Sequence, residues 1–227
     1  MTDSLEQQYF FISEDMRGTD LALPGRTIYP MISLGGRVDP DFWSEEPIAP
    51  GRPMDFEVEP DMPDPPEVYD AAGMLLSSDG PIVRTAVRDA LVTFAPFDAQ
   101  FVPAFIISRR GYDETYEDWY FLHLWHQRDW VDREASEQHV SGSGRVHERY
   151  RKIVLDAGKV AMVPENERLM ARISIFDNDL LLLHKRVVDV LLERRTKGVL
   201  FIPLEHYTIA SGWFDTHLDE IEARHPW

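Results

Sequence analysis

The chain contains no cysteine. It therefore has no disulfide, no thiolate zinc site and no thiol nucleophile. It also lacks an apolar run of the roughly 18 residues that a membrane-spanning helix requires. Its opening, MTDSLEQQYFFISEDMR, does not place an apolar segment after a basic one, as a secretory signal does. These absences predict a protein of the reducing cytoplasm that does not enter a membrane.

Positive charge is scarce in the first 70 residues. That part holds sixteen Asp and Glu against four Arg and no Lys, whereas residues 71–227 hold 24 acidic and 19 basic residues. The net charge of the whole chain is −17. A field of this sign repels nucleic acid and anionic membranes and attracts cationic partners. We therefore expect a basic protein as the partner; the alternative is that the charge only keeps the protein soluble.

Apolar residues are sufficient for a substantial core, since they make up 44% of the 227 residues. Ten of the sixteen prolines, however, fall within residues 1–70. Because proline fixes φ and lacks an N–H, this density predicts an acidic, irregular N-terminal region without long helices or internal sheet strands. Two short strands are expected there, at residues 8–13 and 54–58. The region would wrap a core supplied by a second part, residues 71–227.

One phrase occurs twice, one hundred residues apart. Residues 87–103 read VRDALVTFAPFDAQFVP and residues 187–203 read VVDVLLERRTKGVLFIP. The apolar spacing predicts a helix followed by a strand in both copies. In the first copy the helix would include Ile82 and Val83 and be capped by Ser78 or Asp79. In the second, Gly198 would end the helix as a C′ glycine. We interpret the two units as scaffold that supports one sheet.

The remaining pattern completes an α+β fold with a mainly antiparallel sheet. Residues 119–125 are aromatic and aliphatic without interruption, which predicts a buried central strand. Further strands are expected at residues 153–163 and 172–176, and at 101–107, where an internal proline predicts an edge or a bulge. Residues 141–145 predict a loop. The last 17 residues predict a short amphipathic helix on Phe214, Leu218 and Ile221.

Few residues suggest catalysis. His123 and His126 are three apart, a spacing that suits metal binding on a helix but points the two rings to opposite faces of a strand. We therefore interpret them as core histidines. The GSG around Ser143 lacks the residues of a phosphate loop or nucleophile elbow. We expect no catalytic residue, no cofactor and no metal. The alternatives are a small hydrolase or metal-dependent enzyme that uses Asp, Glu and these histidines, and an acidic adaptor.

The order of motifs resembles the bacterial polymorphic-toxin immunity proteins classed as family eleven. Residues 70–207 carry the resemblance, through the repeated helix–strand phrase, LHLWHQRDWVDREAS and ISIFDND. The shared positions include an Asp-x-x-x-Ser, here Asp132 and Ser136, and a Gly-x-x-Phe-x-Pro, here Gly198, Phe201 and Pro203. The resemblance implies a protein that binds a cognate toxin and silences it. It implies no catalytic residues. Such toxins are often delivered by contact-dependent or type VI secretion.

The acidic N-terminal region is the expected binding surface. Alternation in DFEVE sends its carboxylates to one strand face, where they are either solvated or form a docking surface for a basic toxin such as a nuclease. Aromatic anchors would exclude water from the interface. Phe56 is an additional candidate anchor. The expected partner-binding residues are Phe42, Trp43, Glu45, Glu46, Asp55, Glu57, Glu59 and Asp61.

Overall fold

The computed structural model describes residues 4–14, 32–34, 45–49, 51, 53–58, 66–77, 80–108, 115–140, 146–175, 178–207, 219–220 and 223–226. The helices are α1 (Leu5–Gln8), α2 (Pro66–Ala71), α3 (Thr85–Leu91), α4 (Ala157–Met162) and α5 (Lys185–Glu193), with 3-10 turns at Val92–Phe94, Glu165–Glu167 and Leu204–His206. The strands are β1 (Tyr9–Glu14), β2 (Ile32–Leu34), β3 (Met54–Val58), β4 (Met74–Ser77), β5 (Gly80–Arg84), β6 (Ala99–Ile107), β7 (Thr115–Leu124), β8 (Gln127–Arg128), β9 (Glu137–Val140), β10 (Val146–Lys152), β11 (Met170–Ile175), β12 (Asn178–His184) and β13 (Val199–Pro203).

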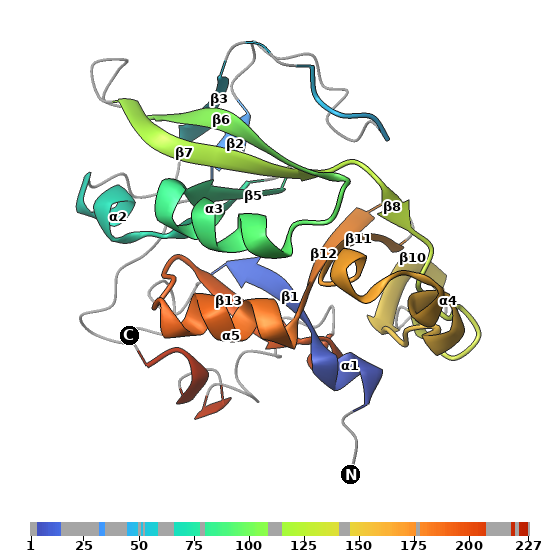
Figure 1. Ribbon diagram of the computed structural model, residues 1–227. Coiled ribbons are helices and arrows are strands. Elements are labelled where there is room, and N and C mark those ends of the chain that lie inside the picture. Colours follow the sequence, from blue (N-terminus) through green and yellow to red (C-terminus); the bar gives the residue numbers. More distant parts are fainter. Residues whose placement is uncertain are drawn as a thin grey trace.

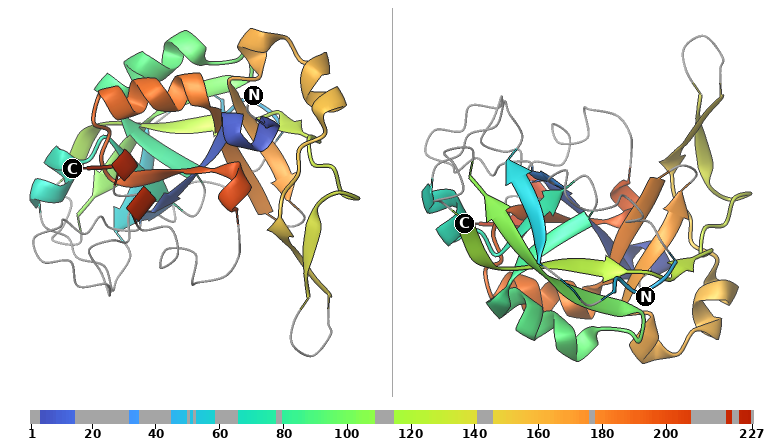
Figure 2. Two further views of the ribbon diagram at one scale, coloured as in Figure 1. Left: turned by 90° about the horizontal axis from the view of Figure 1, so that it is seen from below. Right: turned by 90° about the horizontal axis from the view of Figure 1, so that it is seen from above.

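These elements form an α+β protein whose sheets are mostly antiparallel, as the sequence predicts (Figure 1). One sheet has the order β13-β1-β12-β11-β8, and a second closes on itself as β2-β3-β6-β7-β5-β4. Three pairings are parallel: β3 with β6, β2 with β4, and β8 with β11. The hairpin of β9 and β10 extends away from the two sheets (Figure 2). Among the described helices, none is long and apolar enough to cross a membrane.

The repeated phrase forms two equivalent units, each a helix followed by a strand. Helix α3 leads to β6 and α5 leads to β13, and the two helices lie side by side along one side of the molecule (Figures 1 and 2). Both helices bury their apolar faces in one shared core. The first helix contributes Val87 and Leu91, and the second contributes Val187 and Leu191. A buried side chain of this kind contributes about 1.5–3 kcal/mol, so packing alone explains the repetition.

Each unit is also preceded by a strand, and this corrects the predicted start of the first helix. Ile82 and Val83 lie in β5, where they pair with Leu75 and Met74 of β4. Helix α3 begins only at Thr85. Apolar neighbours suit a buried strand as well as a helix, so spacing alone does not separate the two. The caps expected at Ser78 and Asp79 lie outside the described residues.

Helix α5 ends before Gly198, contrary to the prediction. Arg195 takes the left-handed C′ position with φ 54°, and its N–H donates to the Leu192 carbonyl while the Thr196 N–H donates to the Leu191 carbonyl. These two bonds form a Schellman motif. Gly198 is needed for another reason. Its φ is +100°, and a Cβ there would lie 2.0 Å from the Met74 carbonyl oxygen. The glycine lets the start of β13 approach β4 closely.

The proline-rich N-terminal region supplies internal strands, so the prediction that it cannot is wrong. Strand β1 lies between β13 and β12, and β3 lies between β2 and β6. Both are free of proline, because the prolines fall in the segments around them. Tyr9 and Phe10 of β1, and Phe56 and Val58 of β3, are buried. The region contributes to the core that it was expected to wrap.

Of two further strand predictions, the edge or bulge expected near Pro103 is confirmed as an irregularity, and the strand expected at residues 153–163 needs correction. Strand β6 is internal, but β3 pairs with it only from Ala104 onward, so Pro103 lies beyond that partner. The predicted irregularity is present as a register shift against β7 between Ala104 and Ile106. Residues 153–163 contain α4 instead of a strand, because the Asp156 carboxylate accepts the N–H groups of Gly158 and Lys159 and caps that helix. The loop at 141–145, Phe214, Leu218 and Ile221 lie outside the described residues.

Candidate partner-binding surface

Strand β3 presents the predicted alternation. Met54, Phe56 and Val58 are buried, whereas Glu57 is exposed and Asp55 is half-buried. The Phe56 ring packs on the ring of Phe121 with centroids 5.8 Å apart. The hypothesis that Phe56 anchors a partner is therefore wrong, because the barrel interior holds that side chain. The two carboxylates remain available at the surface, next to Phe105 and Ile107 near the end of β6.

Glu45 and Glu46 lie at the other end of β6, and two contacts fix their segment. The Ile48 N–H donates to the side-chain oxygen of Gln100 (2.9 Å), and the Gln100 amide donates back to the Ile48 carbonyl (2.8 Å). His123 Nε2 lies 3.1 Å from the Glu46 carbonyl oxygen. A carbonyl only accepts, so this nitrogen carries the proton. Both glutamates are exposed, and their backbone is held in place.

His123 is a buried, neutral residue of the barrel rather than a metal ligand. Its pKa is lowered, mainly because burial disfavours the charged ring, although the bond to Glu46 opposes this and the nearby Arg172 charge adds to it. His126 lies beyond the end of β7 and is exposed, so the interpretation as a core histidine holds for His123 and is wrong for His126. In the described part of the chain, no three His, Asp or Glu side chains converge as a metal site.

An exposed aromatic group lies beside this segment, and sequence reasoning missed it. The Phe97 side chain is 64% exposed although the residue is large and apolar. Its ring packs edge-on against Trp125 (centroids 6.5 Å apart) and near His126 (6.4 Å). Trp125 in turn lies 6.4 Å from His123, which contacts Glu46. The available signal was the repeat itself, because Phe97 aligns with Lys197 in a connection where the fold needs no apolar residue.

Buried ion pairs hold this aromatic group in position. The Arg128 guanidinium lies over the Phe97 ring, 5.7 Å from its centroid, and 3.3 Å from the carboxylate of buried Asp98. Behind it, Arg172 donates to Asp179 (2.7 Å) and to the Leu124 carbonyl (3.0 Å). These contacts tie the start of β6 and the end of β7 to the five-stranded sheet, which contains β8 and β11. Phe97 is therefore presented on a rigid base, as a binding anchor requires.

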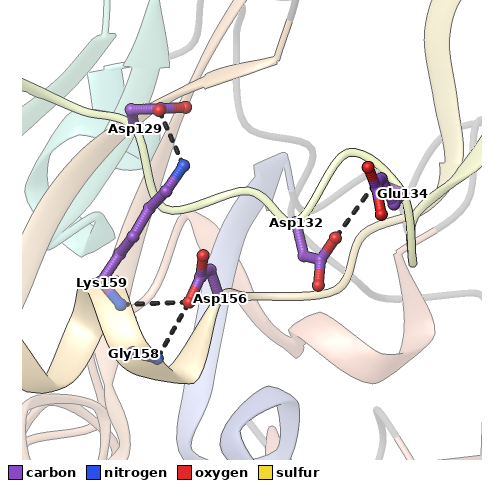
Figure 3. A network of polar contacts seen from close by, with 6 residues as sticks. All are labelled: Asp129, Asp132, Glu134, Asp156, Gly158 and Lys159. Carbon is purple, nitrogen blue, oxygen red and sulfur yellow. Dashed lines mark hydrogen bonds and ion pairs between the residues drawn. The ribbon is translucent and has the colours of Figure 1, made fainter.

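Asp132 and Ser136 stabilise the fold. The Asp132 carboxylate accepts the N–H groups of Glu134 and Ala135, both at 3.0 Å, and closes the turn drawn in Figure 3. The Ser136 hydroxyl accepts the Val154 N–H at 2.9 Å and donates to the Val154 carbonyl at 3.3 Å. Figure 3 also shows the Asp156 cap of α4 nearby. The motif joins the segment after β8 to the segment after β10.

The other predicted binding residues, Phe42, Trp43, Glu59 and Asp61, lie outside the described residues. Comparison of the sequence with protein-family models and with curated proteins finds no match. The described surface has exposed carboxylates at the two ends of β6, and the Phe97 ring lies at the end that carries Glu45 and Glu46.

Proposed function

We propose that the protein is an immunity protein that binds a cognate bacterial toxin domain and silences it. The observation that carries the proposal is the exposed Phe97 ring, held beside the Glu45–Glu46 segment of a chain with a net charge of −17. Rigid aromatic anchors surrounded by polar groups dominate the energy of protein interfaces. The resemblance of residues 70–207 to immunity family eleven supports the same function.

The partner that fits this surface is basic. Negative charge near an anchor steers a cationic partner into contact and suppresses binding of acidic ones. A nuclease is one such partner, because its cleft must hold polyphosphate with Lys and Arg. Carboxylates could occupy that cleft in place of the phosphates, so we propose that the complex occludes the toxin's active site.

Co-purification tests the proposal. The C-terminal domain encoded by the gene immediately upstream is produced as an inactive variant and captured on the immobilised full-length protein. We expect a stable complex, and Phe97→Ala should raise its Kd about thirtyfold or more, as the loss of about 2 kcal/mol at a hot spot predicts. Met162→Ala is the matched control, because Met162 is also exposed (79%) but lies on α4.

The outcomes separate the general proposal from its location. If the neighbouring domain does not bind, the assignment as its immunity protein fails. If it binds equally to the Phe97→Ala and Met162→Ala variants, the immunity function stands and the surface proposed for it is wrong. In that case the segments 108–118 and 137–148 are the next surfaces to test.

A further inference from the structure

A pocket of about 410 Å³ lies where the two helix–strand units meet. The first turn of α3 forms one wall, through Ala86 and Val87, and residues 194–196, just after α5, form another. The end of α2 and residues 72–73 close it on a third side. This place is distinct from the Phe97 surface, because Phe97 follows the opposite end of α3.

The pocket carries more positive than negative charge, in contrast to the chain as a whole. Among the described residues that line it, Arg84, Arg194 and Arg195 are basic and Asp118 alone is acidic. Asp118 is already neutralised, since it forms an ion pair with Arg84 (3.5 Å) and accepts the hydroxyl of Thr85. Arg84 is fixed by donating to the Tyr69 and Asp70 carbonyls, at 3.3 and 3.0 Å. The charges of Arg84 and Asp118 thus balance each other within the wall of the pocket.

Arg194 and Arg195 differ from Arg84, whose side chain is held by hydrogen bonds and an ion pair. Both are exposed at the rim, and neither forms a side-chain hydrogen bond or ion pair with a residue that the structure describes. Arg195 also adopts φ 54° at a C′ position where glycine is the usual residue. An arginine in this conformation is strained, and such strain is retained mostly at functional positions. Because the Schellman bonds occupy the last carbonyls of α5, these do not face the pocket as free acceptors.

Thr196 provides an independent indication of a ligand. The residue is 3% exposed, lines the pocket, and its hydroxyl has no hydrogen-bond partner among the residues that the structure describes. Buried hydroxyl groups are normally hydrogen-bonded, because an unpaired one has lost its water without replacement. A hydroxyl can donate one hydrogen bond, and Thr196 is the lining residue whose buried donor is not used within the described chain.

We propose that this pocket binds a small organic oxyanion, a carboxylate or a phosphate ester. The Arg194 and Arg195 guanidinium groups hold the anionic end, with Thr196 donating to it, and the carbon part lies against Ala71, Ala72 and Val87. Arginine suits this role because its planar fork donates two parallel hydrogen bonds to either group. The inference does not depend on toxin binding, and it concerns a different face of the molecule.

The experiment titrates the full-length protein with inorganic phosphate, phenyl phosphate and butyrate, each at constant ionic strength set with chloride, and follows binding by NMR. We expect one saturable site, stronger for phenyl phosphate than for inorganic phosphate if the carbon part contributes. Preference for butyrate over both phosphates would assign the carboxylate class. Chemical shifts should change at residues 71–73, 86–87 and 194–196.

Variants decide whether the arginines hold the anion. Arg195→Gly removes the guanidinium at a backbone conformation that glycine favours, so the fold is retained. Together with Arg194→Gln it should weaken binding at least about tenfold, since each charge-assisted bond is strong. Thr196→Val, which keeps the shape, should weaken it less. Arg151→Gln on β10 is the control for a surface arginine and should change nothing. Absence of saturable binding by all three probes, or equal effects of the Arg151 and Arg195 variants, overturns the proposal.

Discussion

The two helix–strand units share a scaffold and differ in the connection from helix to strand. The first connection reads TFAPFD (residues 93–98) and the second reads ERRTKG (residues 193–198). The first exposes Phe97 and buries Asp98 against Arg128. The second presents Arg194 and Arg195, which have no side-chain partner in the described part of the chain, to a pocket, and it brings Gly198 onto the Met74 carbonyl. The sequence is repeated along the buried faces of the two helices and diverges in the two connections, at both exposed and buried positions.

The directions of the two helices decide where the two connections lie. The first turn of α3 lies beside the residues that follow α5, so the two helices run in opposite directions and their connections lie at opposite ends. One scaffold thus presents an acidic, aromatic surface at one end and a basic pocket at the other. The two proposals made here can therefore be tested independently of each other.

The largest expected effect tests the shared scaffold. Leu91→Asp and Leu191→Asp each place a carboxylate where the native side chain is fully buried, and each should lower the free energy of unfolding by about 4 kcal/mol or more. Val92→Asp is the matched control, because the neighbouring Val92 is 54% exposed. Chemical denaturation of the three variants measures the difference. Equal stability of the Leu91 and Val92 variants would contradict a common buried role for the two units.

The second prediction concerns the connection after α5. Gly198→Ala should destabilise the fold by more than about 1 kcal/mol, because the new Cβ meets the Met74 carbonyl and φ is unfavourable. Arg195→Gly should act in the opposite sense and stabilise it by up to about 1 kcal/mol, since glycine relieves the left-handed strain. Gly51→Ala, at an open position, is the control. Thermal unfolding that shows loss of stability in both Gly198→Ala and Arg195→Gly would refute this account of the connection.

Parts of this architecture could be predicted from local pattern. Strand β3 has the predicted bounds, and β13 follows α5 as the second copy of the phrase predicts, because alternation and a run of β-branched and aromatic residues specify a strand with little outside help. The start of α3 was not predictable in this way, since Ile82 and Val83 suit either element until β4 is known to pair with them. The strand predicted at residues 153–163 is replaced by α4, because the Asp156 side chain caps a helix there.

The candidate sites depended more on long-range contacts. Alternation identified Asp55 and Glu57 as one face of β3, and composition identified the acidic region that contains Glu45. Neither could show that Phe97 lies near Trp125, or that residues 194–196 face the first turn of α3. Both arrangements arise from the packing of elements distant in the sequence. The repeat offered a local clue, because its two copies differ most in the connections that contain Phe97 and residues 194–196.

The third prediction compares the two acidic groups along β6. If the toxin docks at the first connection, Glu45→Lys with Glu46→Lys should lower k_on for the toxin domain about tenfold, because exposed charges act mainly on association. Asp55→Lys with Glu57→Lys changes the net charge equally but lies at the other end of β6, so its effect should be smaller. Stopped-flow binding at two salt concentrations measures both, and wild-type k_on should fall as salt rises. Equal losses would show that only the net charge matters.

The smallest expected effect concerns pH at the first connection. The pKa of His123 is lowered in the folded protein, mainly by burial, whereas in the unfolded chain it is about 6.5. Below about pH 6.5 the unfolded state therefore binds more protons than the folded state, so stability should fall as pH decreases from 7 to 5. His184, also lowered by burial, contributes in the same sense. His123→Gln keeps a donor for the Glu46 carbonyl but does not titrate, so its stability should decline less steeply with falling pH than that of the wild type. If denaturation midpoints measured across this range decline equally in the two proteins, His123 is not the group that titrates. The structure that supports Trp125 and Phe97 would then not respond to pH through His123.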